Sequence, residues 1–381
     1  MTHKKIMHVV SVSFVLPFIL GDQLDYFSNM GMNISLVCSS SKQFFEFANE
    51  YKVRPYALNI KRKFSPFADL KAIYILSRIL KKEKIEIVIG HTPKGALISM
   101  IAAKIVGTKR RIYFRHGIFY ETSNGIKKCI LRHIEKLTSY CANLIVCVSE
   151  SVLNLSITDN LNPSFKNILL NSGSCNGINF EYFNRKNLVD EDLFSLKAVN
   201  KINNDDFVVG FVGRLVIDKG IKELLIAWKI VSTRHPNAKL LLIGPYEKRN
   251  GLSKDLILHI KNDPSIINID YVIDVRPYYA LMDIFILPSY REGFPTVVLE
   301  ASAMLLPVIT TRSTGCIDSI VENVTGIYTS LDENDICNSI EYYMEFPEMV
   351  KRHGMNGRNR IIHDFGQIDI WKEIEDKLYF N

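Results

Sequence analysis

The chain has 381 residues, of which 47% are apolar and 23% are charged, and its formal net charge is +7. This length is too great for a single hydrophobic core and predicts two domains, while the composition excludes a disordered or fibrous protein. The seven cysteines form no CxxC pair, so we expect neither a disulfide framework nor a zinc site, and free thiols are typical of a reducing cytoplasm.

The first predicted element follows a short basic segment. Residues 6–20 are largely apolar and imitate a signal peptide, but they include His8, Ser11 and Pro17 and lack a small-residue cleavage site. We therefore expect a buried first strand over residues 6–12. No apolar stretch reaches the ~20 residues that a membrane-spanning helix needs, so a soluble or peripheral protein is expected.

Strands and helices are predicted to alternate through the first half. Because the expected strands are continuous apolar runs, they are typical of a parallel sheet that helices cover on both faces. In chain order, the first-half strands are residues 6–12, 33–38, 85–90, 111–115 and 144–149, and the helices are residues 22–30, 67–82, 96–106 and 126–141.

The alternation breaks over residues 182–206, which are polar and charged and read as a linker. It then restarts, so we expect two doubly wound halves with a cleft between them. The predicted domains are residues 1–199 and 200–362, with a tail over residues 363–381. The second-half strands are residues 207–212, 239–243, 266–271, 284–287 and 307–310, and the helices are residues 220–235, 253–261, 276–282, 334–345 and 368–378.

The most informative segment is residues 288–300, with the sequence PSYREGFPTVVLE. It follows a buried apolar strand, and Gly293 permits a tight turn there. Pro295 is suited to the first position of a helix, where its missing N–H would have no partner in any case. The predicted order is therefore strand, loop and helix start.

This order places two carboxylates at the edge of the sheet where ligands bind in open α/β folds. Glu292 lies on the loop, and Glu300 lies in the second turn of the helix. Carboxylates accept hydrogen bonds from hydroxyls, while the N–H groups of Phe294 and Thr296 favour anions. A nucleotide sugar, with hydroxyls at both ends and phosphates in the middle, matches this layout.

A basic turn follows the strand over residues 207–212. Arg214 offers a planar fork for phosphate oxygens, and Lys219 offers a mobile point charge. Gly213 and Gly220 allow the backbone to approach a ligand closely. Such a turn alone is more typical of a solvated loop, and it is neither a Walker loop nor GxGxxG. Its position at a strand end, like that of the two glutamates, favours a binding site.

The first half offers further candidates at strand ends. Gly21 follows the first strand, while His91 and His116 precede glycine-containing turns and carry titratable groups. His8, inside the first strand, is interpreted as a core residue. No Asp-x-Asp pair follows a predicted strand, where it would hold a metal with a diphosphate, so we expect protein cations to replace Mg²⁺ and no cofactor to be required. The positive charge of this half favours a phosphate-rich surface, or else is a solvated helix face, and its candidate residues are Lys61, Arg62, Lys63, Lys94, Lys127 and Lys128.

Taken together, these residues resemble the GT-B-fold retaining glycosyltransferases of family 4, which make bacterial polysaccharides. The resemblance spans nearly the whole chain and depends on three segments: residues 211–220 (FVGRLVIDKG), residues 287–301 (LPSYREGFPTVVLEA) and residues 314–326 (TGCIDSIVENVTG). It implies two Rossmann-like domains facing across a cleft, with the tail helix crossing back to the first. It also implies a donor site made of Gly21, Gly213, Arg214, Lys219, Glu292, Gly293, Phe294, Pro295, Thr296 and Glu300.

The resemblance also implies roles for individual residues. Arg214 and Lys219 would bind the donor diphosphate, Glu292 the hexose and Glu300 the ribose, while His116 would lie beside the donor sugar. These residues, except Glu300, are the expected catalytic set.

Two first-half segments, residues 91–96 (HTPKGA) and 115–121 (RHGIFYE), resemble enzymes that extend undecaprenyl-diphosphate-linked sugars in capsule, O-antigen or N-glycan assembly. Members of that subgroup often transfer N-acetylgalactosamine or a related hexosamine from UDP, and many carry a Gly-Gly pair where this chain has Gly21. The expected partners are a UDP-sugar, a polyprenyl-diphosphate-linked acceptor and the cytoplasmic face of the plasma membrane, where the protein would be peripheral.

Two other functions stay open at this point. The first is a UDP-sugar 2-epimerase on the same fold, in which carboxylates and histidines would move a proton at C2 without an acceptor. The second is a non-enzymatic scaffold that binds a membrane or nucleic acid through the basic face. The scaffold leaves the paired glutamates and the Arg-Lys turn unexplained, so no nucleic-acid partner is expected.

Overall fold

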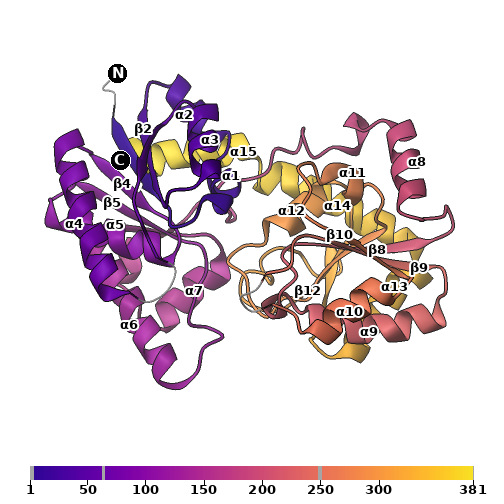
Figure 1. Ribbon diagram of the computed structural model, residues 1–381. Helices are drawn as coiled ribbons and strands as arrows, with labels where there is room; N and C mark the ends of the chain where they lie inside the picture. The colour runs from indigo at the N-terminus through magenta and orange to yellow at the C-terminus, as the bar shows by residue number, and fades with distance from the viewer. Residues whose placement is uncertain (1–3, 62–64, 248–250, 381) are drawn as a thin grey trace. The chain divides into compact units, whose positions relative to one another are not determined.

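The structure is a computed structural model that describes residues 4–61, 65–247 and 251–380. The chain forms two compact units (Figure 1), one made of Met1–Gly177 with Ile368–Asn381 and the other of Ile178–Gln367. The sequence places the first boundary at residues 199/200, whereas the structure places it at residues 177/178. The difference arises because the intervening segment packs on the core of the second unit, where Leu193 is buried.

The first unit is built on a seven-stranded parallel sheet with the order β3-β2-β1-β4-β5-β6-β7. Strand β1 is almost completely buried in the middle of this sheet, which confirms the predicted first strand. The strands are β1 (Lys5–Val9), β2 (Asn33–Cys38), β3 (Arg54–Ala57), β4 (Ile87–Gly90), β5 (Arg110–Arg115), β6 (Leu144–Cys147) and β7 (Asn167–Leu169).

Helices cover both faces of this sheet, as the apolar strands predict. Successive residues of β1 point to opposite faces, so Ile6 packs in one core cluster and Met7 in the other. The first cluster includes residues of α1 (Leu16–Ile19), α2 (Gln23–Asn29), α3 (Lys42–Glu50) and α15 (Gln367–Ile374). The second includes residues of α4 (Pro66–Glu83), α5 (Pro93–Ile105), α6 (Gly125–Cys141) and α7 (Glu150–Thr158).

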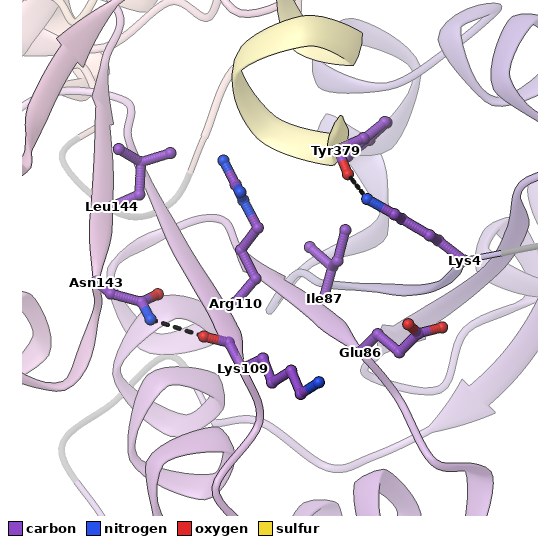
Figure 2. A pocket seen from close by; sticks show the side chains of 8 residues that line it. All are labelled: Lys4, Glu86, Ile87, Lys109, Arg110, Asn143, Leu144 and Tyr379. Atoms are coloured by element: carbon purple, nitrogen blue, oxygen red, sulfur yellow. Dashed lines mark hydrogen bonds between the residues drawn. The ribbon is translucent and has the colours of Figure 1, made fainter. Parts of the chain in front are cut away.

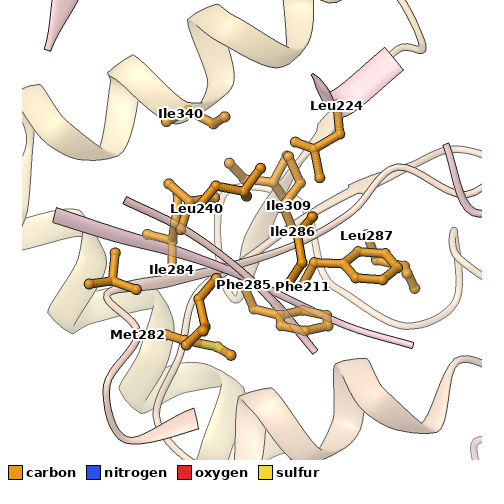
Figure 3. Packing of buried hydrophobic residues seen from close by; sticks show 14 of the residues in the cluster. Phe211, Leu224, Leu240, Met282, Ile284, Phe285, Ile286, Leu287, Ile309 and Ile340 are labelled. Carbon is orange, nitrogen blue, oxygen red and sulfur yellow. The ribbon is translucent and has the colours of Figure 1, made fainter. Parts of the chain in front are cut away.

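The second unit has a six-stranded parallel sheet with the order β10-β9-β8-β11-β12-β13. In Figure 3, Leu224 and Ile340 lie on one side of the strands, while Met282 and Phe285 lie on the other. The strands are β8 (Phe207–Val212), β9 (Ala238–Ile243), β10 (Ile266–Ile269), β11 (Ile284–Leu287), β12 (Val308–Thr311) and β13 (Gly326–Thr329). The helices are α8 (Asp190–Val199), α9 (Ile221–Arg234), α10 (Lys254–Asn262), α11 (Arg276–Tyr279), α12 (Thr296–Ala303), α13 (Glu333–Glu345) and α14 (Pro347–Asp364).

The linker predicted over residues 182–206 is wrong. This segment contains α8, and both Leu193 and Ile202 are buried in the core of the second unit. Its charged residues lie mostly on the exposed side of an amphipathic helix, which resembles a linker when composition alone is considered. Helices α3, α7 and α14 also have no counterpart among the predicted elements.

The tail of the chain folds with the first unit. Helix α15 continues into a π-helical turn over Glu375–Phe380, and Trp371, Leu378 and Tyr379 are buried there. The tail residues therefore complete one face of the first sheet. Among the described residues, no helix has both the length and the apolar character that crossing a bilayer requires.

Candidate active site

The candidate site of the second unit lies where the order of the strands reverses. Strands β8 and β11 are neighbours and parallel, although β9 and β10 separate them in the sequence. The loops that leave β8 and β11 therefore start side by side at the carboxyl edge of the sheet. Such switch points are where open α/β sheets bind ligands.

These two loops are packed tightly against each other. Gly220 has φ +70°, and a Cβ atom at this position would lie 1.9 Å from the carbonyl oxygen of Pro288. The backbone N–H of Tyr290 donates to the carbonyl of Asp218 at 3.0 Å. Both the positive φ and the close approach require glycine, so Gly220 fixes the distance between the two loops.

The predicted basic and acidic residues meet across this contact. The ammonium of Lys219 forms an ion pair and hydrogen bond with Glu292 Oε1. Ser289 Oγ donates to the same oxygen at 2.8 Å, and the N–H of Glu292 donates to the carbonyl of Thr314 at 2.8 Å. The two side chains of the pair are only 16% and 14% exposed. The loop after β12 therefore also holds Glu292 in place.

Glu300 is buried in the second turn of α12. Its Oε2 accepts a hydrogen bond from the hydroxyl of Tyr279 at 2.9 Å, and that hydroxyl also lies 3.2 Å from the carbonyl of Val297. Burial disfavours the charged carboxylate and raises the pKa of Glu300 to about 7, while the hydrogen bond from Tyr279 acts in the opposite direction. At neutral pH this carboxyl group is poised between its two protonation states.

Arg214 lies at the end of β8 but is less enclosed than Lys219. Its Nη1 donates to Glu247 Oε2 at 2.9 Å, and its side chain is 43% exposed. The adjacent backbone is close to the next loop, because a Cβ atom on Gly244 would lie 2.1 Å from the carbonyl oxygen of Gly213. Arg214 is thus a cation at the edge of the site, and it is already paired with a carboxylate.

The segment between the two glutamates differs slightly from its prediction. Pro295 caps α12 in an extended conformation, and the helix begins at Thr296. A Cβ atom at Gly315 would lie 2.5 Å from the carbonyl oxygen of Gly293, so the loop after β12 closes against this turn. Phe294 packs against Phe365, with ring centroids 5.3 Å apart. The ring of Phe294 thus anchors the helix start to the end of α14.

In the first unit, three histidines lie at the carboxyl edge of neighbouring strands. His8 of β1, His91 after β4 and His116 after β5 are joined by two ring-to-ring hydrogen bonds of 3.0 and 2.9 Å. Burial lowers the pKa of His8 to about 3 and that of His116 to about 4. His8 is buried, as expected of a core residue, and its ring also belongs to a polar chain that leads to His116.

Comparison with known proteins identifies the family. The family model for glycosyl transferases group 1 matches residues 194–360, and the model described as glycosyl transferase 4-like matches residues 7–149. The capsular polysaccharide biosynthesis glycosyltransferase CapM of Staphylococcus aureus is 37% identical over 376 residues, which cover 98% of this chain and 97% of CapM. The chain belongs to the glycosyltransferases.

A second relative and a solved structure extend the comparison. An Escherichia coli enzyme named UDP-Gal:alpha-D-GlcNAc-diphosphoundecaprenol alpha-1,3-galactosyltransferase is 23% identical, with 100% of this chain and 98% of that enzyme covered. The crystal structure of Anabaena Alr3699/HepE in complex with UDP-glucose matches with a TM-score of 0.82 and 16% identity, and 99% of each chain is covered. The two sheets of this glycosyltransferase are thus those of the GT-B fold. The family assignment favours glycosyl transfer over the 2-epimerase and the scaffold.

Apart from His91 and His116, the first-unit residues that the sequence singled out are dispersed in this glycosyltransferase. Gly21 has φ +45° between α1 and α2, where a Cβ atom would lie 2.7 Å from the carbonyl oxygen of Pro17. This turn gives Gly21 a conformational role. Lys94 forms an ion pair with Asp69, and its side chain is only 17% exposed, so it does not contribute to an open basic face. Lys61, Lys127 and Lys128 are exposed, while Arg62 and Lys63 lie outside the described residues.

The contacts of two residues in these sites were not predicted from the sequence. Tyr279 lies in α11, and no motif relates it to Glu300. His8 was interpreted as a core residue because a single histidine in an apolar strand gives no indication of a partner. Both were missed because their partners are brought close only by the fold. A buried histidine on each of two neighbouring strands could have suggested the pair of His8 and His91.

A separate pocket of about 440 Å³ lies at the opposite edge of the first sheet (Figure 2), where the strands begin. Two of its cations bind the tail. Lys4 donates to the carbonyl of Tyr379, and Arg110 donates to the carbonyl of Lys377. Both bonds satisfy carbonyl groups at the end of a helical segment, which otherwise lack partners. This basic pocket therefore holds the tail on the first unit.

Proposed function

We propose that this glycosyltransferase moves a sugar from a UDP-sugar to a sugar linked to undecaprenyl diphosphate, in the biosynthesis of a capsule, an O-antigen or a related glycan. The transferred sugar is N-acetylgalactosamine or another hexosamine or hexose, and transfer retains the anomeric configuration without a metal ion. The observation that carries the proposal is the joining of Lys219 to Glu292 at the switch point. The names of the relatives from S. aureus and E. coli support the pathway, the UDP donor and the lipid-linked acceptor.

In this proposal the second unit binds the donor. Lys219 and Arg214 bind the diphosphate, and the backbone around Gly213 and the start of α12 approach the phosphates. Lys219 exchanges Glu292 for a phosphate oxygen, so the Glu292 carboxylate becomes free to accept hydrogen bonds from the sugar. Ser289 and the N–H bond to Thr314 keep Glu292 at the edge during this exchange. Glu300 accepts hydrogen bonds from the ribose hydroxyls.

The same cations supply the chemistry that a metal ion would otherwise supply. As the bond between the anomeric carbon and the β-phosphate oxygen breaks, negative charge develops on the phosphate. A largely buried ammonium such as that of Lys219 stabilises this charge more strongly than one in water. The departing phosphate takes the proton of the acceptor hydroxyl, which attacks from the same face. His116 of the first unit contributes a neutral hydrogen-bonding group for the sugar.

The first unit carries a surface suited to a membrane-bound acceptor. Helix α5 packs against both α4 and α6, and exposed apolar side chains on these two outer helices include Phe67 at 89% and Ile126 at 81% exposure. Lys127 and Lys128 stand exposed beside Ile126. Apolar side chains flanked by cations favour an anionic bilayer surface. We therefore place the protein at the inner face of the membrane as a peripheral enzyme.

The test is a transfer assay with defined substrates. The purified protein is incubated with individual UDP-sugars and an undecaprenyl-diphosphate-linked N-acetylhexosamine, with and without EDTA, and the released UDP is measured. We expect UDP release that depends on the acceptor and is unaffected by EDTA. NMR of the product reports the anomeric configuration. UDP release that requires added metal contradicts the mechanism, and C2 conversion of the UDP-sugar without an acceptor indicates an epimerase.

Matched variants test the assigned residues. Lys219→Ala is expected to lower kcat by at least about a hundredfold, because it removes a preorganised charge from the leaving group. Lys222→Ala is the control, since its exposed side chain lies in the first turn of the next helix, α9. Equal rates for a folded Lys219→Ala protein and the wild type would overturn the role of Lys219.

A further inference from the structure

The three histidines of the first unit form one continuous hydrogen-bonded chain. His8 Nδ1 lies 3.0 Å from His91 Nε2, and His91 Nδ1 lies 2.9 Å from His116 Nε2. The residues come from β1 and from the ends of β4 and β5, which are neighbours in the sheet. His91 thus uses both of its ring nitrogens, and His116 keeps only Nδ1 for other partners.

The middle histidine is held firmly in its place. His91 is 1% exposed, and its ring lies nearly parallel to the rings of His8 and Phe114, with centroid distances of 5.3 and 5.0 Å. The next residue, Thr92, has φ +60°, and its hydroxyl lies 2.8 Å from that of Ser11. This cross-link between the loops after β1 and β4 fixes the backbone beside His91. The ring therefore has little freedom to turn away from either neighbour.

All three rings are neutral near pH 7. Burial lowers the pKa of His8 to about 3 and that of His116 to about 4, and it lowers the pKa of His91 well below its usual value. A neutral imidazole has one N–H and one bare nitrogen. Because His91 bonds through both nitrogens, it donates one hydrogen bond and accepts the other.

This requirement couples the protons of the three rings. If His91 donates from Nδ1, then His116 Nε2 accepts, the proton of His116 is on Nδ1, and His8 also carries its proton on Nδ1. If His91 instead donates from Nε2, all three protons are on Nε2 and His116 Nδ1 is bare. The chain thus permits two arrangements, and the three rings have the same tautomer in each.

We propose that His91 and His8 are positioning residues that hold the ring of His116 and couple its tautomer to their own, so that His116 offers substrate a single hydrogen-bonding nitrogen, Nδ1, in a tautomer that all three rings share. This inference rests on the proposed function, because it assigns a role to His116 in sugar transfer. A shared tautomer matters because Nδ1 of His116 can change between donor and acceptor only if all three rings change together, whereas an isolated imidazole changes independently.

Two substitutions of His91 separate its two bonds. In His91→Asn, a side-chain amide atom stands near the position of Nδ1 and keeps the bond to His116. In His91→Gln, the amide reaches the position of Nε2 and keeps the bond to His8 but loses the bond to His116. Both variants remain polar in a buried site, so each is the control for the folding of the other.

The first measurement reads the tautomers directly and does not depend on activity. The protein is labelled with ¹⁵N-histidine, and long-range ¹H–¹⁵N spectra near pH 7 report which nitrogen of each ring carries the proton. Substitution of each histidine assigns its signals. In the wild type we expect one shared tautomer for His8, His91 and His116. In His91→Asn, His116 is expected to keep a single tautomer. In His91→Gln, its signals are expected to be an average over both tautomers. Unlike tautomers within the wild-type chain overturn the proposal.

The second measurement uses the transfer assay. We expect His91→Gln to lower kcat by about tenfold or more, with a smaller change in the KM for the UDP-sugar, and His91→Asn to restore most of the rate. If the wild-type protein is active and the two variants have equal kcat values, the inference about the histidine chain is overturned and the proposed function is not. A wild-type protein that transfers no sugar overturns the proposed function, while the spectra still test the histidine chain.

Discussion

If Glu300 binds the donor ribose as proposed, its protonation state makes donor binding depend on pH. Burial raises the pKa of this carboxyl to about 7, whereas an exposed glutamate titrates near 4.5. If the ionised carboxylate accepts both ribose hydroxyls, then protonation removes one of the two accepting oxygens. At pH 6 about a tenth of the carboxyls are ionised and at pH 8 about nine-tenths are, so Kd for a UDP-sugar is expected to be about tenfold higher at pH 6.

Isothermal titration calorimetry between pH 5.5 and 8.5 checks this expectation. Glu300→Gln removes the titration and should give a Kd with a much smaller pH dependence, which also reveals any contribution from other groups. Tyr279→Phe should move the midpoint to higher pH, because the hydrogen bond from Tyr279 lowers the pKa of Glu300. A wild-type Kd that stays constant from pH 6 to pH 8 refutes this account, as does a Kd of Glu300→Gln that changes with pH as much as the wild-type Kd does.

The raised pKa of Glu300 also affects the stability of the fold, which is expected to fall as the pH rises, whereas donor binding is expected to strengthen. Between pH 4.5 and 7 the folded protein holds a proton on Glu300 that the unfolded chain releases, so stability falls as the pH rises through this window. Above pH 7 the buried carboxylate costs about 3 kcal/mol. Glu300→Gln is therefore expected to raise the free energy of unfolding by about that amount at pH 8, and by much less at pH 4.5. Urea unfolding at both pH values provides the measurement, and a difference that does not grow with pH contradicts it.

Three further expectations follow from other contacts. Gly220→Ala should lower the free energy of unfolding by more than about 1 kcal/mol and reduce transfer, because the positive φ and the Pro288 carbonyl leave no room for a Cβ atom; an unchanged urea midpoint would contradict this. Glu135→Leu should lower the free energy of unfolding by about 3–5 kcal/mol, because it leaves Arg115, which is 0% exposed, without its carboxylate partner. Glu46→Ala breaks an exposed ion pair and should lower it by under about 1 kcal/mol. Similar urea midpoints for the two variants would argue against this difference. Lys127→Glu with Lys128→Glu should weaken sedimentation with anionic vesicles and leave UDP-sugar binding unchanged; equal binding to neutral vesicles would argue against the charged surface.

The sheets were predictable because each central strand is a continuous apolar run that ends at a polar or glycine-containing turn. The expected strand over residues 33–38 coincides with β2, and that over residues 207–212 coincides with β8. Both strands are buried on two faces, so their composition alone distinguishes them from surface segments. The edge strands β3 and β13 are short, and nothing in their composition sets them apart.

Helix α14 was not predictable, for a different reason. It is a markedly polar helix, and its contacts with the rest of the second unit are made partly by glycine instead of an apolar stripe. A Cβ atom at Gly354 would lie 2.0 Å from the carbonyl oxygen of Leu305, and Gly357 lies against the side chain of Ser302. Close backbone approach replaces side-chain burial there, and hydrophobic periodicity does not report it.

The candidate site was predictable in its charged residues but not in their pairing. The sequence placed Lys219 and Glu292 at corresponding strand ends, and the structure joins them in an ion pair. Arg214 is likewise paired, with Glu247, which no motif indicated. Each phosphate-binding cation that we propose therefore already has a carboxylate partner. A donor has to replace these carboxylates, so the net affinity for a diphosphate is the difference between two ion pairs and not the full strength of one.

The exchange of Glu292 for a phosphate oxygen at Lys219 can also affect which ligand binds more tightly. If Lys219 leaves Glu292 for the diphosphate, the free energy of the first pair is lost unless Glu292 finds new donors at once. The hydroxyls of the transferred sugar can supply them, whereas UDP without a sugar cannot. The pair therefore favours the intact donor over the product UDP, and release of UDP restores the contact between Lys219 and Glu292. A single ion pair at the switch point would thus select the substrate and assist the departure of the product.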